Sequence, residues 1–69
     1  MKNNNFGKNL KLLRQEKELS QRELGNHLGV INQTVSFWET GAREPDLDTL
    51  IKIANYFNVT IDELLDYTK

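Results

Sequence analysis

Apolar residues recur along the chain at the spacing of amphipathic helices. Phe6, Leu10 and Leu13 lie at positions i, i+4 and i+7, and they predict a first helix from about Phe6 to Lys17. No stretch alternates apolar and polar residues as a half-buried strand does, and the chain contains one proline, Pro45. The pattern therefore predicts an all-α fold.

Two short helices joined by a tight turn follow the first helix. Ser20 and Glu23 have the spacing of a capping box, in which the hydroxyl and the carboxylate each accept a hydrogen bond from a backbone N–H at the start of a helix. Gly29 is expected to end this helix in the left-handed conformation that glycine adopts without strain. The next helix is predicted from about Asn32 to Thr40. We expect its inner face to consist of Ile31, Val35 and Trp38.

Two more helices are predicted in the last third of the chain. Asp46 is expected to cap a helix from Leu47 to about Phe57, and Thr60 with Glu63 forms a second capping box before a short fifth helix. The inward residues of the longer helix are Leu50, Ile53, Ala54 and Phe57. The short helix carries Ile61, Leu64 and Leu65. We expect one domain over residues 1–69, with a core at about 6–66.

Composition excludes several kinds of chemistry. The 69 residues contain no cysteine, which rules out disulfides, thiolate metal sites and cysteine nucleophiles. His27 is the single histidine and cannot build a metal site by itself. Asp62, Glu63 and Asp66 form a short acidic cluster, but helix capping accounts for Glu63 and no third ligand is in view. We therefore expect no metal, no cofactor and no enzymatic activity.

The charge is almost balanced but unevenly distributed. The net charge is −1, which alone argues against a nonspecific nucleic-acid binder. Residues 1–45 hold seven basic and five acidic side chains, whereas residues 46–69 hold two basic and five acidic ones. No apolar run approaches the roughly 18 residues of a membrane span, and the first residues lack the apolar stretch of a signal peptide. These features predict a cytoplasmic protein with no membrane partner.

The outer face of the third predicted helix is polar but carries no charge. It consists of Asn32, Gln33, Ser36, Phe37 and Thr40. Asparagine and glutamine amides can pair bidentately with the N6 and N7 atoms of adenine in the major groove. A helix-turn-helix needs such a face on its second helix and an apolar inner face that packs on the domain. The alternative is an ordinary solvated helix face, on which Glu and Lys are more common.

Four segments have the residues and the spacing of a known family: Leu19–Leu24, Leu28–Val30, Thr34–Gly41 and Pro45–Leu50. Through them the chain resembles the lambda-repressor-like helix-turn-helix family, which includes the Cro and cI phage repressors and the xenobiotic-response-element regulators. The resemblance spans about residues 6–66. It implies a compact five-helix domain whose second and third helices form the helix-turn-helix, and which binds palindromic double-stranded operator DNA as a homodimer.

The resemblance also implies roles for individual residues. Base contacts are expected from Asn32, Gln33, Ser36 and Phe37. Phosphate contacts are expected from Gln21, Thr34, Thr40 and Arg43, and Gln21 is also expected to support the recognition helix. Arg14 and Glu39 match an internal ion pair that would tie the first helix to the third.

At four positions the chain departs from the family pattern. Ile31 replaces the usual Ser or Thr cap of the third helix, and Glu18 replaces a usual glycine after the first helix. Gly25 stands where alanine is usual. Phe37 stands where a polar or basic residue is common, so it either touches a thymine methyl group or packs against a protein partner.

The C-terminal end of the chain carries three large apolar residues. Leu64, Leu65 and Tyr67 are expected to form a dimer surface, because so short a tail would not bury all three on its own domain. We expect a stand-alone transcription repressor of phage-immunity or mobile-element type, prokaryotic or phage-encoded. The alternative is an antitoxin or an adaptor that binds an unknown protein partner through Phe37 and the C-terminal tail.

Overall fold

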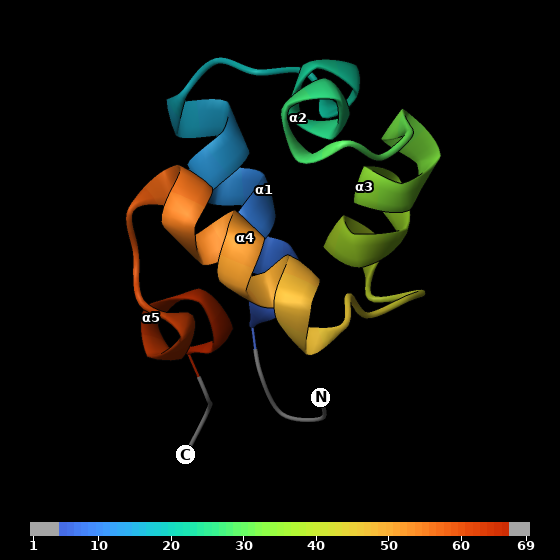
Figure 1. Cartoon of the computed structure of the whole chain (residues 1–69). Coiled ribbons are helices and arrows are strands. Elements are labelled where there is room, and N and C mark those ends of the chain that lie inside the picture. The colour runs from blue at the N-terminus through green and yellow to red at the C-terminus, as the bar shows by residue number, and fades with distance from the viewer. Residues whose placement is uncertain (1–4, 67–69) are drawn as a thin grey trace.

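The computed structural model describes residues 5–66, which contain five α-helices and no strand (Figure 1). The helices are α1 (Phe6–Glu16), α2 (Gln21–Leu28), α3 (Asn32–Thr40), α4 (Leu47–Phe57) and α5 (Ile61–Leu65). The predicted all-α, five-helix class is confirmed, and α1 ends one residue earlier than expected because Lys17 is its C-cap.

The caps predicted for three helices are present. The Ser20 hydroxyl accepts a hydrogen bond from the Glu23 N–H at 3.0 Å, and the Glu23 carboxylate accepts one from the Ser20 N–H at 2.9 Å. Thr60 and Glu63 repeat this arrangement at the start of α5. The Asp46 carboxylate accepts a hydrogen bond from the Thr49 N–H at 2.9 Å. The hydrogen bonds from Ser20 and Thr60 favour the ionised carboxylates and lower the pKa of Glu23 and Glu63. Hydrogen bonding from the Thr49 side chain, and then from its N–H, lowers the pKa of Asp46.

The departures at Ile31 and Glu18 have the expected structural consequences. Ile31 is the N-cap of α3 and makes no side-chain cap hydrogen bond. Glu18 adopts a left-handed backbone with φ 56°, where glycine would be unstrained. The placement of Ile31 on the inner face with Val35 and Trp38 is wrong, because its side chain is 64% exposed. Its extended N-cap backbone lies before the first helical turn, so helical periodicity does not apply to it.

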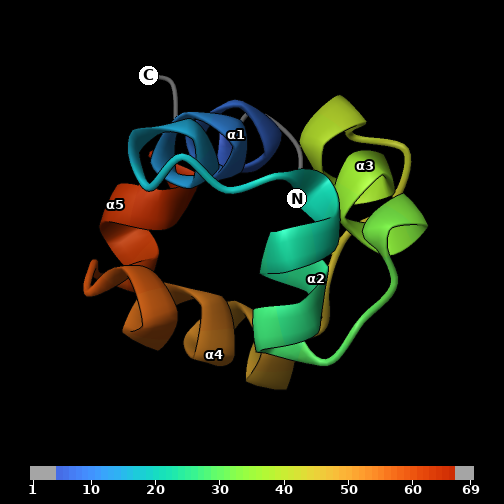
Figure 2. The ribbon, with the colours of Figure 1, turned by 90° about the horizontal axis from the view of Figure 1, so that it is seen from above.

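All five helices contribute to one hydrophobic core. α3 packs on α1 and α2, and α5 packs on α1 and α4. Figures 1 and 2 place α3 and α5 at opposite sides of the molecule, with α1 and α4 between them. The buried apolar residues are Phe6, Leu10, Leu24, Leu28, Val35, Trp38, Leu50, Ile53, Ala54, Phe57, Leu64 and Leu65.

The predicted dimer surface at the C-terminal end is corrected by the structure. Leu64 is 0% exposed and Leu65 7% exposed, because α5 folds back and closes the core. The backbone of α5 is held there by the Asn9 amide, which donates to the Leu64 carbonyl at 3.0 Å, and by the Asn5 N–H, which donates to the Leu65 carbonyl at 2.7 Å. Neither leucine is available to a second copy. Tyr67 lies outside the described residues.

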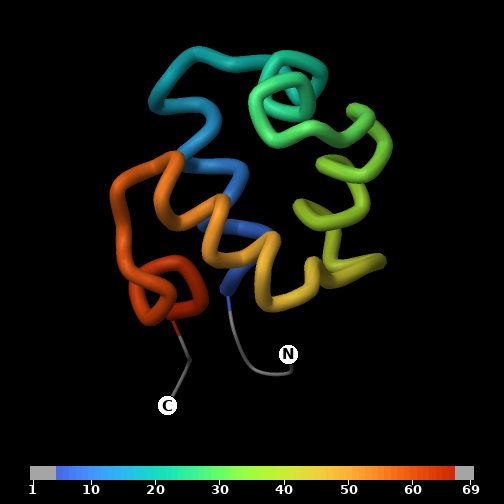
Figure 3. The backbone as a smooth tube through the Cα atoms, viewed as in Figure 1, coloured from blue at the N-terminus to red at the C-terminus, as the bar shows by residue number. Residues whose placement is uncertain are grey.

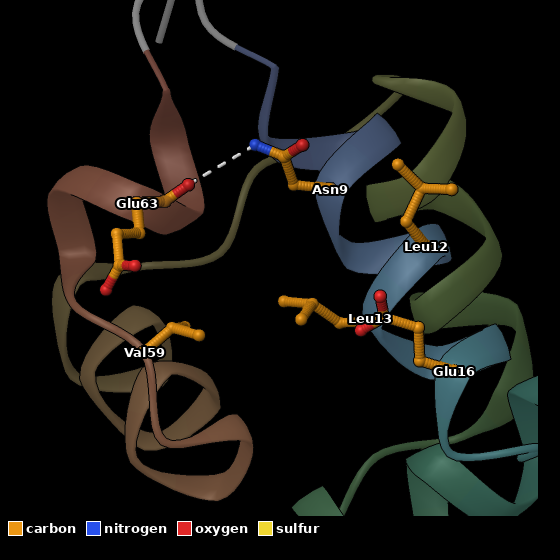
Figure 4. Close-up of a pocket in the computed structure, with 6 residues that line it drawn as sticks. All are labelled: Asn9, Leu12, Leu13, Glu16, Val59 and Glu63. Carbon is orange, nitrogen blue, oxygen red and sulfur yellow. Dashed lines mark hydrogen bonds between the residues drawn. The ribbon is translucent and has the colours of Figure 1, made fainter.

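An open pocket of about 260 Å³ lies between α1 and the residues around α5. Leu13 and Val59 reach toward one another across it, and the Asn9 amide donates to the Glu63 carbonyl at its edge (Figure 4). Its other lining residues are Leu12 and Glu16.

None of the helices described here has the length and apolar character to cross a membrane.

Candidate nucleic-acid interface

The turn between α2 and α3 depends on two glycines. Gly29 ends α2 in the left-handed conformation with φ 77°, and the N–H of Val30 donates to the Gly25 carbonyl at 2.9 Å. A Cβ atom at Gly25 would lie 2.5 Å from the Val30 carbonyl oxygen, which is closer than real contacts allow. Glycine at position 25 therefore lets the turn lie directly against α2, and this contact helps set the angle between α2 and α3.

A partly buried ion pair fastens α3 to α1. Arg14 donates from Nε to Glu39 Oε2 at 2.6 Å and from Nη2 to Glu39 Oε1 at 3.1 Å. The two side chains are 12% and 4% exposed. The hydrogen bond to Glu39 raises the pKa of Arg14, which also donates to the Leu19 carbonyl at 2.7 Å. The predicted pair is confirmed.

Gln21 extends this network into α2. Its Nε2 atom donates to Glu39 Oε1 at 3.2 Å, so the carboxylate accepts hydrogen bonds from α1 and from α2. An amide nitrogen carries two protons, and one remains for another acceptor. Gln21 is therefore held at the start of α2 by the same carboxylate that anchors α3.

The polar face of α3 lies at the edge of the molecule. Val35 and Trp38 are 0% and 5% exposed and bury the inner face of the helix against the core. Asn32 and Gln33 are exposed at its first turn, and Ser36 is half-buried one turn further on. Thr34 is half-buried and Thr40 is exposed at the end of the helix. α3 thus displays amide and hydroxyl groups on a rigid support.

The end of α3 brings Phe37 and Arg43 together. Gly41 ends the helix with φ 82°, and the Arg43 N–H then donates back to the Phe37 carbonyl at 3.2 Å. The Arg43 guanidinium carbon lies 5.1 Å from the centroid of the Phe37 ring. Sequence reasoning missed this pair. Its signal was an aromatic residue followed six positions later by arginine across a helix-ending glycine.

α4 supports the helix-turn-helix from behind, through contacts that the sequence pattern did not reveal. The Lys52 ammonium donates to the Leu28 carbonyl at the end of α2, at 2.8 Å. The rings of His27 and Tyr56 stack at 5.2 Å, and the Lys17 ammonium lies 5.7 Å from the Tyr56 ring. The backbone in Figure 3 shows α2 leading through a tight turn into α3, and a longer loop leading from α3 into α4. Lys52 is the single basic residue of α4, which was the available signal.

The fold and sequence match known proteins over most of the chain. A helix-turn-helix family model matches residues 10–64. The uncharacterized HTH-type transcriptional regulator YqaE of Bacillus subtilis is 42% identical over 60 residues, which are 87% of this chain and 52% of that protein. The chain therefore spans about half the length of this curated relative.

Two solved structures have the same arrangement of helices. A transcriptional regulator from Listeria innocua has a TM-score of 0.88 and 35% identity, over 96% of this chain and 62% of that one. The P22 c2 repressor, solved in complex with a synthetic operator, has a TM-score of 0.81 and 28% identity, over 87% of this chain and 91% of that one. The chain belongs to the helix-turn-helix family of Cro/cI-like transcriptional regulators.

Proposed function

We propose that this chain binds double-stranded DNA in a sequence-specific manner, with α3 in the major groove. The observation that carries the proposal is the uncharged amide and hydroxyl face of α3, whose amides are exposed while the opposite face of the helix is buried. A recognition helix must present short hydrogen-bonding groups outward and stay fixed on its domain. The ion pair between Arg14 and Glu39 supplies that fixation.

Base recognition is assigned to the first two turns of α3. Asn32 and Gln33 are exposed neighbours at its N-terminal end, which is the end that a helix-turn-helix directs at base edges. Each amide can donate to one adenine atom and accept from another, which distinguishes adenine from the other bases. Ser36 adds a short hydroxyl one turn along.

Phosphate contacts are assigned to the two ends of the helix-turn-helix. Gln21 keeps one amide proton free at the start of α2, and Arg43 is exposed just after α3. Thr34 lies beside the base-reading residues. The Thr40 hydroxyl already donates its proton to the Phe37 carbonyl at 3.3 Å, so it would have to exchange this bond for one to a phosphate. Arg43 is therefore the stronger phosphate ligand at this end.

The regulatory role follows from the family. We propose a transcription repressor of phage-immunity or mobile-element type, acting in a prokaryotic cytoplasm as a homodimer on a palindromic operator. A single nine-residue helix contacts few base pairs, and a two-fold dimer doubles the site and places two recognition helices about 34 Å apart. The P22 c2 repressor shares this fold and was solved in complex with a synthetic operator. The alternative antitoxin or adaptor function has lost part of its basis, since Leu64 and Leu65 are buried.

Binding to the upstream intergenic DNA of the protein's own gene tests the proposal. We would measure fluorescence anisotropy for the wild type, for the double variant Asn32→Ala/Gln33→Ala, and for the control Gln15→Ala/Asn55→Ala, which removes two exposed amides from α1 and α4. The expected result is tight binding that is lost in the α3 variant, retained in the control, and absent on a shuffled sequence. Equal, weak binding to both sequences by all three proteins would refute the proposal.

A further inference from the structure

Phe37 and Arg43 form a structured pair on the surface at the end of α3. The Phe37 side chain is 36% exposed although it belongs to the recognition helix. The guanidinium carbon lies 5.1 Å from the ring centroid, within the roughly 6 Å at which an arginine is attracted to an aromatic face. The ring therefore has a partner within the protein before any ligand is bound.

The backbone holds the two side chains together. The Phe37 carbonyl accepts hydrogen bonds from the Arg43 N–H at 3.2 Å and from the Thr40 hydroxyl at 3.3 Å. Gly41 permits the reversal, because its φ of 82° is one that other residues adopt only with strain. The position of the Arg43 backbone is thus set by the same residue whose ring contacts its side chain.

The contact leaves the hydrogen-bonding capacity of the guanidinium intact. A ring attracts a cation through its π electrons and uses none of the five N–H donors of arginine. A planar guanidinium with free donors matches a phosphate diester. Holding it in place beforehand reduces the side-chain entropy that binding would otherwise cost.

We propose that Phe37 is a positioning residue, whose ring holds the Arg43 guanidinium ready for a backbone phosphate at the end of the recognition helix. This inference rests on the proposed DNA-binding function, and it removes Phe37 from the base-contacting set. The ring face that contacts Arg43 is not free to pack on a thymine methyl group. Sequence specificity then rests on the amides and hydroxyl of α3, and Phe37 supplies affinity.

The pair is tested first in the free protein. Ring currents from Phe37 should shift the NMR signals of the Arg43 side chain, and the shift should disappear in Phe37→Leu and persist in Phe37→Tyr. Leucine retains an apolar side chain of similar size without a π face, and tyrosine retains the ring. Thermal unfolding of each variant checks that the domain remains folded. Unshifted Arg43 signals in the wild type would overturn the proposal without reference to DNA.

The second test uses duplexes that the wild type selects from a random pool. We expect Phe37→Leu to weaken binding about two- to fivefold and Phe37→Tyr to restore it. In an Arg43→Ala background, which itself should lower the salt slope by about 0.9 per protomer and so by about 1.8 for a dimer, the change Phe37→Leu should have no further effect. Deoxyuridine in place of thymidine should change the affinity of the wild type and of Phe37→Leu by the same factor.

Three results would overturn the proposal. One is a Phe37→Leu loss that persists in the Arg43→Ala background. Another is a deoxyuridine effect in the wild type that is absent in Phe37→Leu, which would make Phe37 a reader of thymine methyl groups. The third is a Phe37→Leu variant with wild-type affinity. A wild type that selects no sequence while its Arg43 signals are shifted would instead refute the proposed function, and the phosphate role with it.

Discussion

Replacement of Glu39 by glutamine is expected to destabilise the domain more than any exposed charge change. Glu39→Gln preserves the size of the side chain and one acceptor oxygen but removes the negative charge. It thereby replaces two hydrogen bonds between ionised partners, at 2.6 and 3.1 Å, by at most one bond from the Arg14 guanidinium to a neutral amide oxygen. Because the Arg14 side chain is only 12% exposed, water cannot fully replace the lost partner.

The magnitude follows from burial and from the bonds that remain. Breaking a buried pair on one side costs about 3–5 kcal/mol, and the partial exposure of Arg14 together with its bond to the Leu19 carbonyl places this case below that range, at about 2–3 kcal/mol. A domain of 69 residues has a total stability of about 3–10 kcal/mol. The change should therefore lower Tm by about 10–20 °C.

Urea denaturation measures the effect directly. Trp38 is the single tryptophan and is 5% exposed, so its fluorescence reports loss of the core, while circular dichroism follows the helices independently. In Glu39→Gln, the urea concentration at the midpoint of unfolding should fall, while the dependence of the free energy of unfolding on urea, the m value, should stay unchanged. Glu16→Gln, an exposed carboxylate on α1, is the matched control and should stay within about 0.5 kcal/mol of the wild type.

A double-mutant cycle distinguishes the ion pair from simple packing. Arg14→Met in the Glu39→Gln background should cost much less than Arg14→Met alone, because the guanidinium no longer has its charged partner. If Glu39→Gln unfolded at the same urea concentration as Glu16→Gln, or if the two changes were additive, the argument that this pair fastens α3 would be refuted.

Three other changes test separate features. Gly25→Ala should destabilise by about 1–3 kcal/mol despite the better helix propensity of alanine, because the new methyl group meets the Val30 carbonyl at 2.5 Å; a stabilised variant in urea would contradict this. Glu18→Gly should stabilise by about 1 kcal/mol by relieving a left-handed glutamate, seen as a rise in Tm of several degrees, and an unchanged Tm would show no strain there. The pKa of Glu23 and of Glu63 is lower in the folded than in the unfolded chain, so the unfolded chain binds protons more readily and stability should fall as the pH drops below about 5. The variant Glu23→Gln/Glu63→Gln should show a smaller fall in Tm between neutral and acid pH than the wild type. An equal fall in the two proteins would refute the capping argument.

The helices and their ends could be predicted from residues close together in the chain. The capping boxes at Ser20 and Thr60 involve a partner three residues away, and Gly29 and Gly41 end helices through their own backbone freedom. Helical periodicity likewise identified the buried face of α4. The limit of periodicity is visible at Ile31, which precedes its helix and lies exposed.

The candidate site could be located from sequence but not completed. The amide face of α3 and the partner of Arg14 were found by pattern and family resemblance. The family resemblance implied that Gln21 supports α3, but its partner Glu39 depends on how α2 packs on α3. The Phe37–Arg43 pair was not predicted, because it depends on the path of the backbone after α3 ends. A helical wheel gives the direction of a side chain within one helix and no information about its neighbours on another.

The five helices, their caps and most of the inward-facing positions were predictable because they follow from interactions within one or two helical turns, and the family was predictable from motifs and their spacing. The closing of the core by Leu64 and Leu65 of α5 and the bond from Lys52 to the end of α2 depend instead on how whole helices pack. Such contacts join residues tens of positions apart, and they form only where helix packing brings those residues within hydrogen-bonding or van der Waals distance.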